Sequence, residues 1–300
     1  MHEIRCEAPP KRLQKLGLFA NGVFGVNMTA LLGVVDKASM YLQYMKGVDI
    51  LSSRSAEHNH VMAATNQNWG EHMKVLFIAT SVEHGLWLAE LTHPYWHLSE
   101  REIEIDIASP KGGKLTWFAA SDPYDPNSQE ANDIVSKGFL SDKSLVAKLE
   151  TTLPLAGLDL TGYDAVHVAG GGGAAVDLYP NADVAKILEH FFASGKVVGA
   201  ICHGAISLGN NPERIKGRQV TGYSLAEDVE LEKYFGKNFL PNYPQPILEQ
   251  AGAIYSCAQP NGLRVVVDGK LVTGQSQYSA SEYSLQFHHL LTGSTPVLVA

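Results

Sequence analysis

From Met73 onward, the chain alternates short apolar runs of strand-forming residues with longer segments of helical periodicity. The expected strands cover 74–80, 102–109, 165–169 and 196–201, and the expected helices cover 86–98, 182–193 and 279–291. A late β-hairpin is expected over 264–273, around Asp268-Gly269, a pair that favours a type I′ turn. Because strands buried on both faces read as continuous apolar runs, this pattern predicts an α/β fold with a mostly parallel sheet covered by helices on both faces.

The first 72 residues do not follow this alternation. Residues 17–35 are uncharged and fairly apolar and follow three basic residues, which is part of the pattern of a signal peptide or membrane span. Their polar side chains and the lack of a small-residue cleavage site favour a packing or oligomerisation segment instead. Residues 50–72 are polar and read as a linker. The sequence thus predicts an N-terminal extension over 1–72 and an α/β domain over 73–300.

Charge and cysteine content narrow the possible partners. The chain has 23 Lys and Arg against 31 Asp and Glu, a formal net charge of -8, which disfavours binding to nucleic acid or to anionic lipid. Three scattered cysteines, Cys6, Cys202 and Cys257, form neither a disulfide framework nor a zinc motif. We therefore expect a cytoplasmic protein whose α/β domain binds neither nucleic acid nor membrane.

One cysteine lies where an α/β sheet places its functional groups, at the carboxyl end of a strand. Cys202 follows the apolar run 197–201 and precedes a segment that can start a helix, whose free N–H groups lower the pKa of a thiol. Gly199 and Gly204 allow the sharp turn of a nucleophile elbow. The alternative is that Cys202 is a buried small hydrophobic residue, but the adjacent His203 favours the catalytic interpretation.

His203 can serve as a general base or acid and can stabilise the thiolate. A histidine in this role usually has a carboxylate on its other nitrogen, and Glu227 and Asp228 are the candidates, although either could be a solvated surface charge. The four glycines 170–173 can form a nest of N–H groups for an oxyanion. They lack the spacing of a dinucleotide or phosphate loop, so nucleotide binding is not expected.

The ordered motifs resemble one family over about 73–293: KVLFIAT, LAELTHPYWHL, DIASPKGGK, AGGGGAAVDL, GKVVGAICHGAISL, KGRQVTGYSLAED and VVVDGKLVTGQSQYSA. They are similar to the DJ-1/PfpI superfamily, and within it to the Hsp31-like glyoxalase III and deglycase group, which includes stress-response chaperones. The resemblance implies a flavodoxin-like, doubly wound α/β fold related to class I glutamine amidotransferases. It also implies a homodimer.

Carried onto this sequence, the resemblance implies a cysteine nucleophile at Cys202 with His203 beside it. Asp228 falls at the position of the acidic partner, with Glu227 as the fallback. Glu90 matches the carboxylate that lies against the nucleophile and shares a proton with the sulfur. A carboxyl group held near a thiolate has a raised pKa and can donate a proton, which suits a proton shuttle.

The glycine loop and the elbow depart from the family pattern. The loop usually reads Pro-Gly-Gly-His-Gly, whereas this chain has neither the proline nor the histidine, and Ala205 replaces the proline after the elbow. Gly170 and Gly171 remain to bind substrate and an oxyanion together with His203. Substrate preference and rate are the properties that these departures affect.

Some relatives hold a metal near the first helix. His93, His97 and Glu104 lie in that part of this chain, but Ser99 stands where one such histidine is expected. We therefore predict no metal and no cofactor.

The activity implied is a glutathione-independent conversion of 2-oxoaldehydes such as methylglyoxal to 2-hydroxy acids such as lactate, through a Cys202 hemithioacetal. A lyase of this type could also remove early methylglyoxal adducts from proteins, and its partner is a small carbonyl substrate. The alternatives are an amidotransferase-like hydrolase, against which the adjacency of Cys202 and His203 argues, and a holdase chaperone or binding protein in which Cys202 is an oxidation sensor.

Overall fold

The structure is a computed structural model that describes residues 73–294. The proposed extension over 1–72, including the targeting or packing role considered for 17–35, lies outside the described residues. Among the described residues, no helix combines the length and the apolar character needed to cross a membrane.

The described domain is built on a seven-stranded sheet with the spatial order β3-β2-β1-β4-β5-β9-β8. Its neighbours pair in parallel except for the antiparallel edge pair β8 and β9. β6 and β7 form a separate two-stranded sheet. The strands are β1 (Lys74–Ile78), β2 (Glu104–Ser109), β3 (Leu153–Pro154), β4 (Ala165–Val168), β5 (Val197–Ile201), β6 (Gln219–Val220), β7 (Ile254–Tyr255), β8 (Val265–Asp268) and β9 (Leu271–Gly274).

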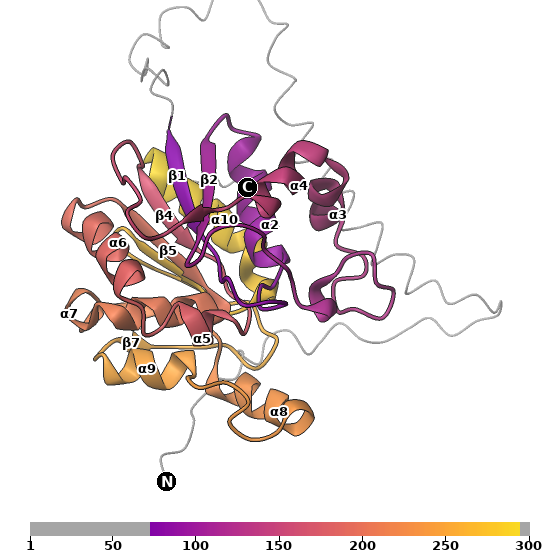
Figure 1. Ribbon diagram of the computed structural model, residues 1–300. Coiled ribbons are helices and arrows are strands. Elements are labelled where there is room, and N and C mark those ends of the chain that lie inside the picture. The colour runs from indigo at the N-terminus through magenta and orange to yellow at the C-terminus, as the bar shows by residue number, and fades with distance from the viewer. Residues whose placement is uncertain (1–72, 295–300) are drawn as a thin grey trace, which may run out of the picture. The chain divides into compact units, whose positions relative to one another are not determined.

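Helices cover both faces of this sheet, as Figure 1 shows. The helices α2 and α10 pack against each other on one face, and α6 packs on the other. The α-helices are α2 (Ala89–Ser99), α3 (Ile134–Ser141), α4 (Lys143–Glu150), α5 (Ala174–Asp177), α6 (Ala182–Ala193), α7 (Pro212–Ile215), α8 (Leu225–Phe235), α9 (Pro244–Gln250) and α10 (Ala280–Thr292). Within residues 73–294, the 3₁₀ helices are η3 (Ala119–Ser121), η4 (Cys202–Asn210) and η5 (Gln277–Ser279). The predicted flavodoxin-like α/β fold is confirmed.

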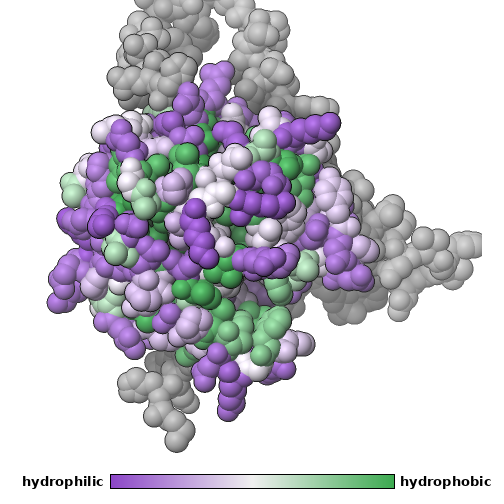
Figure 2. Space-filling view, viewed as in Figure 1, coloured by the Kyte–Doolittle hydropathy of each residue, from purple (hydrophilic) through white to green (hydrophobic). Residues whose placement is uncertain are grey.

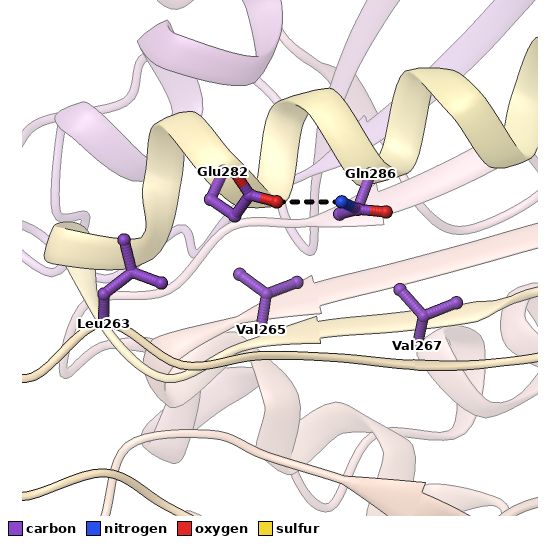
Figure 3. Close-up of a pocket in the computed structure, with 5 residues that line it drawn as sticks. All are labelled: Leu263, Val265, Val267, Glu282 and Gln286. Carbon is purple, nitrogen blue, oxygen red and sulfur yellow. Dashed lines mark hydrogen bonds between the residues drawn. The ribbon is translucent and has the colours of Figure 1, made fainter. Parts of the chain in front are cut away.

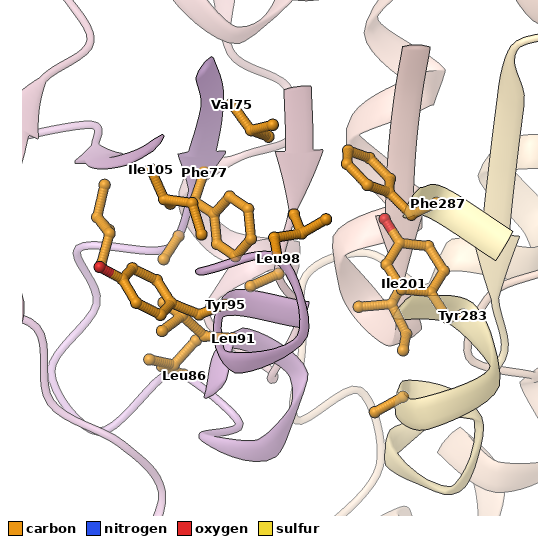
Figure 4. Close-up of a cluster of buried hydrophobic side chains, with 14 of the residues drawn as sticks. Val75, Phe77, Leu86, Leu91, Tyr95, Leu98, Ile105, Ile201, Tyr283 and Phe287 are labelled. Carbon is orange, nitrogen blue, oxygen red and sulfur yellow. The ribbon is translucent and has the colours of Figure 1, made fainter. Parts of the chain in front are cut away.

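Two hydrophobic clusters lie on opposite faces of the sheet because successive strand residues point to opposite sides. In β1, Val75 and Phe77 belong to the cluster under α2 and α10, part of which is drawn in Figure 4. Leu76 and Ile78 belong to the cluster under α6. This burial on both sides explains why the central strands are continuous apolar runs in the sequence.

Most expected elements are confirmed to within a few residues. The first helix begins at Ala89 rather than at residue 86, because Leu86 instead forms a short parallel bridge to Trp117. The late hairpin is confirmed, but its turn differs from the expected type I′. The turn residues are Gly269 and Lys270, and only Gly269 has a positive φ, of 55°.

The surface in Figure 2 is largely hydrophilic, in keeping with the acidic composition. Green hydrophobic residues are visible in several places in that view, including its lower half, where Figure 1 places α8. Val229, Tyr234 and Phe235 of α8 are exposed. Exposed apolar side chains are common on protein surfaces.

Candidate active site

The candidate nucleophile lies at the sharp turn between β5 and η4. Cys202 has a φ of 57°, a left-handed conformation that is strained for a non-glycine residue, and its side chain is buried. The turn also depends on Gly204, because a Cβ there would lie 2.6 Å from the Val168 carbonyl oxygen. The strained elbow that the sequence predicts at Cys202 is therefore present.

The His203 ring lies between the Cys202 sulfur and the Asp228 carboxylate. Its Nδ1 lies 3.6 Å from the Cys202 Sγ, and its Nε2 lies 2.9 Å from Oδ1 of Asp228. An ionised carboxylate only accepts hydrogen bonds, so Nε2 carries the proton and Nδ1 of the neutral ring faces the thiol as an acceptor. This is the base–orienter arrangement of a nucleophilic triad.

The two acidic candidates have different surroundings. Glu227 forms a capping box with Ser224 at the start of α8 and also accepts hydrogen bonds from Asn261 N–H and Gln275 Nε2. It therefore holds loops together, and the carboxylate that reaches His203 is that of Asp228. Burial raises the pKa of Asp228, and the adjacent His203 opposes that rise.

Glu90 completes the cluster from the first turn of α2. Its side chain is fully buried, and neither carboxyl oxygen makes a hydrogen bond of normal geometry. Burial raises the pKa of Glu90 well above its usual value, with the facing Cys202 thiol and Gly170 N–H opposing and the Glu130 carboxylate adding to the rise. Burial therefore favours the protonated form of Glu90, which suits this carboxyl to donate a proton.

The thiol differs from the sequence expectation of a lowered pKa. Burial and the Glu90 carboxyl raise the pKa of Cys202, and the N–H groups of His203 and Gly171 only partly oppose this. Because the thiol and the carboxyl face each other inside the protein, ionisation of either group disfavours ionisation of the other.

The glycine turn after β4 lies directly against Cys202 and Glu90, an approach that is possible because glycine has no side chain. A Cβ at Gly170 would lie 2.5 Å from Oε2 of Glu90 and 2.8 Å from Cβ of Cys202. Gly171 has a φ of 94°, and a Cβ there would lie 2.3 Å from the Trp87 nitrogen. The turn therefore brings its backbone N–H groups against the sulfur and the carboxyl, where they can donate to an oxyanion.

Tyr223 also belongs to the site, although sequence reasoning did not single it out. Its ring stacks on the His203 ring with centroids 4.4 Å apart, and its N–H donates to the Cys202 carbonyl oxygen at 3.2 Å. Its phenol is part-exposed beside the buried cluster, and burial together with the Cys202 charge raises its pKa. The signal available in the sequence was its place in the Thr-Gly-Tyr motif that precedes Asp228.

The residues considered for a metal site are dispersed. His93 lies between Ser281 and Asp133, His97 packs against the His288 ring, and Glu104 is exposed at the start of β2. Ser99 donates to the Trp96 carbonyl within α2. Within residues 73–294, no group of three or more His, Cys, Asp or Glu side chains is placed to hold a metal ion.

A shallow pocket lies elsewhere, between the edge strand β8 and α10 (Figure 3). Its floor is apolar, and the Glu282–Gln286 hydrogen bond runs along one side. It contains no nucleophile and no histidine; its lining residues are Leu263, Val265, Val267, Glu282 and Gln286. The chemistry-bearing residues are therefore those around Cys202.

Known proteins share this domain. The chain is 30% identical over 209 residues to the bovine (Bos taurus) glutamine amidotransferase-like class 1 domain-containing protein 1, covering 68% of this chain and 87% of the relative. It is 30% identical over 219 residues to Glyoxalase 3 of Candida albicans, covering 68% of this chain and 88% of the relative. The crystal structure of glyoxalase III from Candida albicans matches with a TM-score of 0.63 and 26% identity, over 73% of this chain and 98% of that one.

The family comparison covers the part of the chain that carries the elbow, the glycine turn and the first helix. Residues 73–289 match the DJ-1/PfpI family as a whole. On these grounds the chain belongs to the DJ-1/PfpI family.

Proposed function

We propose that this protein is a glutathione-independent glyoxalase that converts 2-oxoaldehydes such as methylglyoxal to 2-hydroxy acids. One observation carries the proposal: the Cys202 thiol lies between the His203–Asp228 pair and the buried carboxyl of Glu90. The reaction needs a nucleophile, a base and a second group that moves a proton between two carbons, and this cluster has all three. Relatives named glyoxalase support the same assignment.

In the first step, His203 accepts the thiol proton and the Cys202 sulfur attacks the aldehyde carbon. The new C–S bond forms as the carbonyl π electrons move to oxygen. The resulting oxyanion accepts hydrogen bonds from the N–H groups of the Gly170–Gly171 turn and of the elbow. Protonation of this oxygen gives the neutral hemithioacetal.

In the second step, a proton leaves the former aldehyde carbon and another reaches the neighbouring ketone carbon through an enediol. Glu90, held protonated by burial, donates to the ketone oxygen or carbon, and its conjugate base with His203 accepts the departing proton. The first carbon is oxidised and the second is reduced, so no external oxidant takes part. Water then hydrolyses the thioester, releasing the 2-hydroxy acid and the thiol.

The same catalytic steps account for a second activity. Attack of Cys202 on an early methylglyoxal adduct would remove that adduct, so a deglycase activity uses the same residues. We further propose that the protein is a homodimer and that its substrate is a small carbonyl compound.

A second candidate is a hydrolase of the amidotransferase-like type, favoured by the name of the bovine relative. It would use Cys202 and His203 to cleave an amide by acyl transfer. That reaction assigns no step to Glu90, whose buried carboxyl faces the sulfur. The glyoxalase reaction gives that carboxyl a function and is therefore preferred.

The test is lactate formation from methylglyoxal in the absence of glutathione. The parent protein is compared with Cys202→Ala and Glu90→Gln, with Cys257→Ala as the cysteine control. We expect the parent and Cys257→Ala to form lactate and the other two variants to lose this activity. An inactive parent with an alkylatable Cys202 would reject the glyoxalase proposal, and amidase activity that survives Glu90→Gln would favour the hydrolase.

A further inference from the structure

Helix α2 contains a proline one turn after Glu90. In an α-helix the carbonyl of residue i accepts from the N–H of residue i+4, and Pro94 has no N–H to offer the Glu90 carbonyl. The first turn of α2 also has no side-chain cap at Leu88. The residue whose carboxyl faces the nucleophile thus lies in a first helical turn with fewer internal hydrogen bonds than usual.

A buried histidine from the neighbouring strand provides the missing donor. The Nε2 of His167 in β4 lies 3.0 Å from the Glu90 carbonyl oxygen. The other ring nitrogen, Nδ1, lies 2.7 Å from the hydroxyl of Tyr283 in α10. Because a carbonyl oxygen only accepts, Nε2 carries the hydrogen, and Nδ1 of the neutral ring accepts from Tyr283.

The surroundings of His167 keep its ring neutral and fixed. Burial lowers the pKa of His167 to about 3, with the hydrogen bond to Glu90 opposing. The ring packs against Phe77 with centroids 4.5 Å apart. Figure 4 shows Tyr283 on α10 beside Phe287 and Ile201, in the same layer as Phe77.

Gly199 makes room for this arrangement. A Cβ at Gly199, in the adjacent strand β5, would lie 2.1 Å from the Tyr283 hydroxyl and 2.6 Å from Phe287 Cδ2. Only a residue without a side chain allows the phenol to reach down to the sheet and meet His167. The strand pair, the tyrosine and the histidine therefore form one continuous support under α2.

We propose that His167 is a positioning residue for Glu90. It replaces the helix hydrogen bond that Pro94 removes and ties the first turn of α2 to β4, so that the Glu90 carboxyl is held against Cys202. The proposal assigns His167 no contact with substrate. Only the measurement of methylglyoxal turnover rests on the proposed function.

The test compares four variants with the parent protein and with one control variant, and it measures two properties. His167→Leu removes the donor, and His167→Gln retains a donor and an acceptor. Pro94→Ala restores an N–H to the helix, and it is made alone and together with His167→Leu. His190→Leu, on α6 beside Phe191, is the control for loss of a part-buried histidine elsewhere. The measurements are kcat and KM for methylglyoxal, and the pH dependence of Cys202 alkylation by iodoacetamide.

We expect His167→Leu to lower kcat on the order of 10- to 100-fold with KM nearly unchanged, since small displacements of a catalytic group have effects of this size. The pH dependence of Cys202 alkylation in His167→Leu should shift toward that of Glu90→Gln. The displaced Glu90 carboxyl no longer raises the pKa of the Cys202 thiol. His167→Gln and the double variant should recover most of the loss. Pro94→Ala alone and His190→Leu should change little.

Two results would overturn the proposal. One is a His167→Leu protein with the parent's kcat and alkylation profile. The other is a double variant no better than His167→Leu, which would show that His167 acts by packing and not by replacing the helix hydrogen bond. If His167→Leu does not fold, His167→Gln and the double variant decide the question by the same criteria. The alkylation profile needs no substrate, so it remains decisive even if methylglyoxal is not the substrate.

Discussion

Two buried histidines are linked to Glu90, His167 directly and His203 through Cys202, and their partners give them different chemistry. His203 has the Cys202 sulfur on one nitrogen and the Asp228 carboxylate on the other. His167 has a phenol on one nitrogen and a backbone carbonyl on the other. Only the first arrangement places a negative charge where it can stabilise an imidazolium.

The comparison shows that burial alone does not make a histidine catalytic. His167 is fully buried among uncharged partners, and its pKa falls to about 3, so it stays neutral through the neutral pH range. It then acts as a fixed hydrogen-bond donor. His203 can accept a proton because the charge it gains faces Asp228. A carboxylate within hydrogen-bond distance therefore distinguishes the histidine proposed as the base from the histidine proposed as a positioning residue.

The largest expected effect comes from removing the carboxylate of His203. Asp228→Asn should lower kcat on the order of 100- to 10,000-fold, because the amide neither stabilises the imidazolium nor fixes the tautomer. Steady-state lactate formation measures this. Glu227→Gln is the matched control and should change kcat by no more than about ten-fold, a smaller effect than loss of a catalytic group. Equal losses in both variants would mean that Asp228 is not the orienting group.

The support under His167 should be sensitive to added volume at Gly199. Gly199→Ala should lower the free energy of unfolding by about 3 kcal/mol, since its methyl would overlap the Tyr283 hydroxyl and the Phe287 ring. Urea denaturation at neutral pH measures the change. Gly138→Ala, in α3 with Trp96 3.6 Å from the new methyl, should instead be neutral or slightly stabilising. A Gly199→Ala protein as stable as the parent would contradict the close approach of Tyr283.

Acid should destabilise the protein through His167. Its pKa is about 3 in the folded protein and 6.5 in the reference state. Between these values the unfolded chain binds a proton that the folded chain does not, so stability is lost as the pH falls below 6.5. The slope is about 1.4 kcal/mol per pH unit for one such group, or about 2 kcal/mol between pH 7 and pH 5.

The check is the difference in unfolding free energy between the parent and His167→Gln, measured by urea denaturation at both pH values. This difference should shrink by about the same 2 kcal/mol at pH 5, because the variant has no group to protonate there. His97→Gln provides a second case, because burial and Arg101 also lower the pKa of His97 to about 3. A difference independent of pH would show that His167 is not held neutral.

The smallest effect is expected from the tyrosine that accompanies His167. Tyr283→Phe removes only a hydroxyl and leaves Nδ1 of His167 without a donor, which should cost about 1.5 kcal/mol of stability. Tyr234→Phe, at an exposed position on α8, should cost nothing measurable. Thermal unfolding of the two variants side by side tests this. Equal changes in stability would mean that the Tyr283 hydroxyl does not stabilise His167.

Much of the fold could be read in the sequence because its signals are local. Apolar runs such as 197–201 predicted the strands, and the register of hydrophobic residues in 182–193 predicted a helix that the structure places at the same residues. The turn of the late hairpin was misplaced by one residue, since the strand pairing and not the Asp-Gly pair decides which residues form the turn. The order of the strands in the sheet was not predicted, because it depends on pairing between segments that are far apart in the sequence.

The sequence by itself determined that a cysteine and a histidine follow a buried strand and offered two acidic residues as partners, while the family resemblance brought Glu90 into consideration. Tertiary structure decided which carboxylate reaches His203, because Asp228 and Glu227 are adjacent in sequence but point to different partners. It also brought together Pro94, His167 and Tyr283, which lie on three separate elements. Sequence patterns report which face of an element is buried, whereas hydrogen bonds between elements depend on distances and directions that only the packed chain defines.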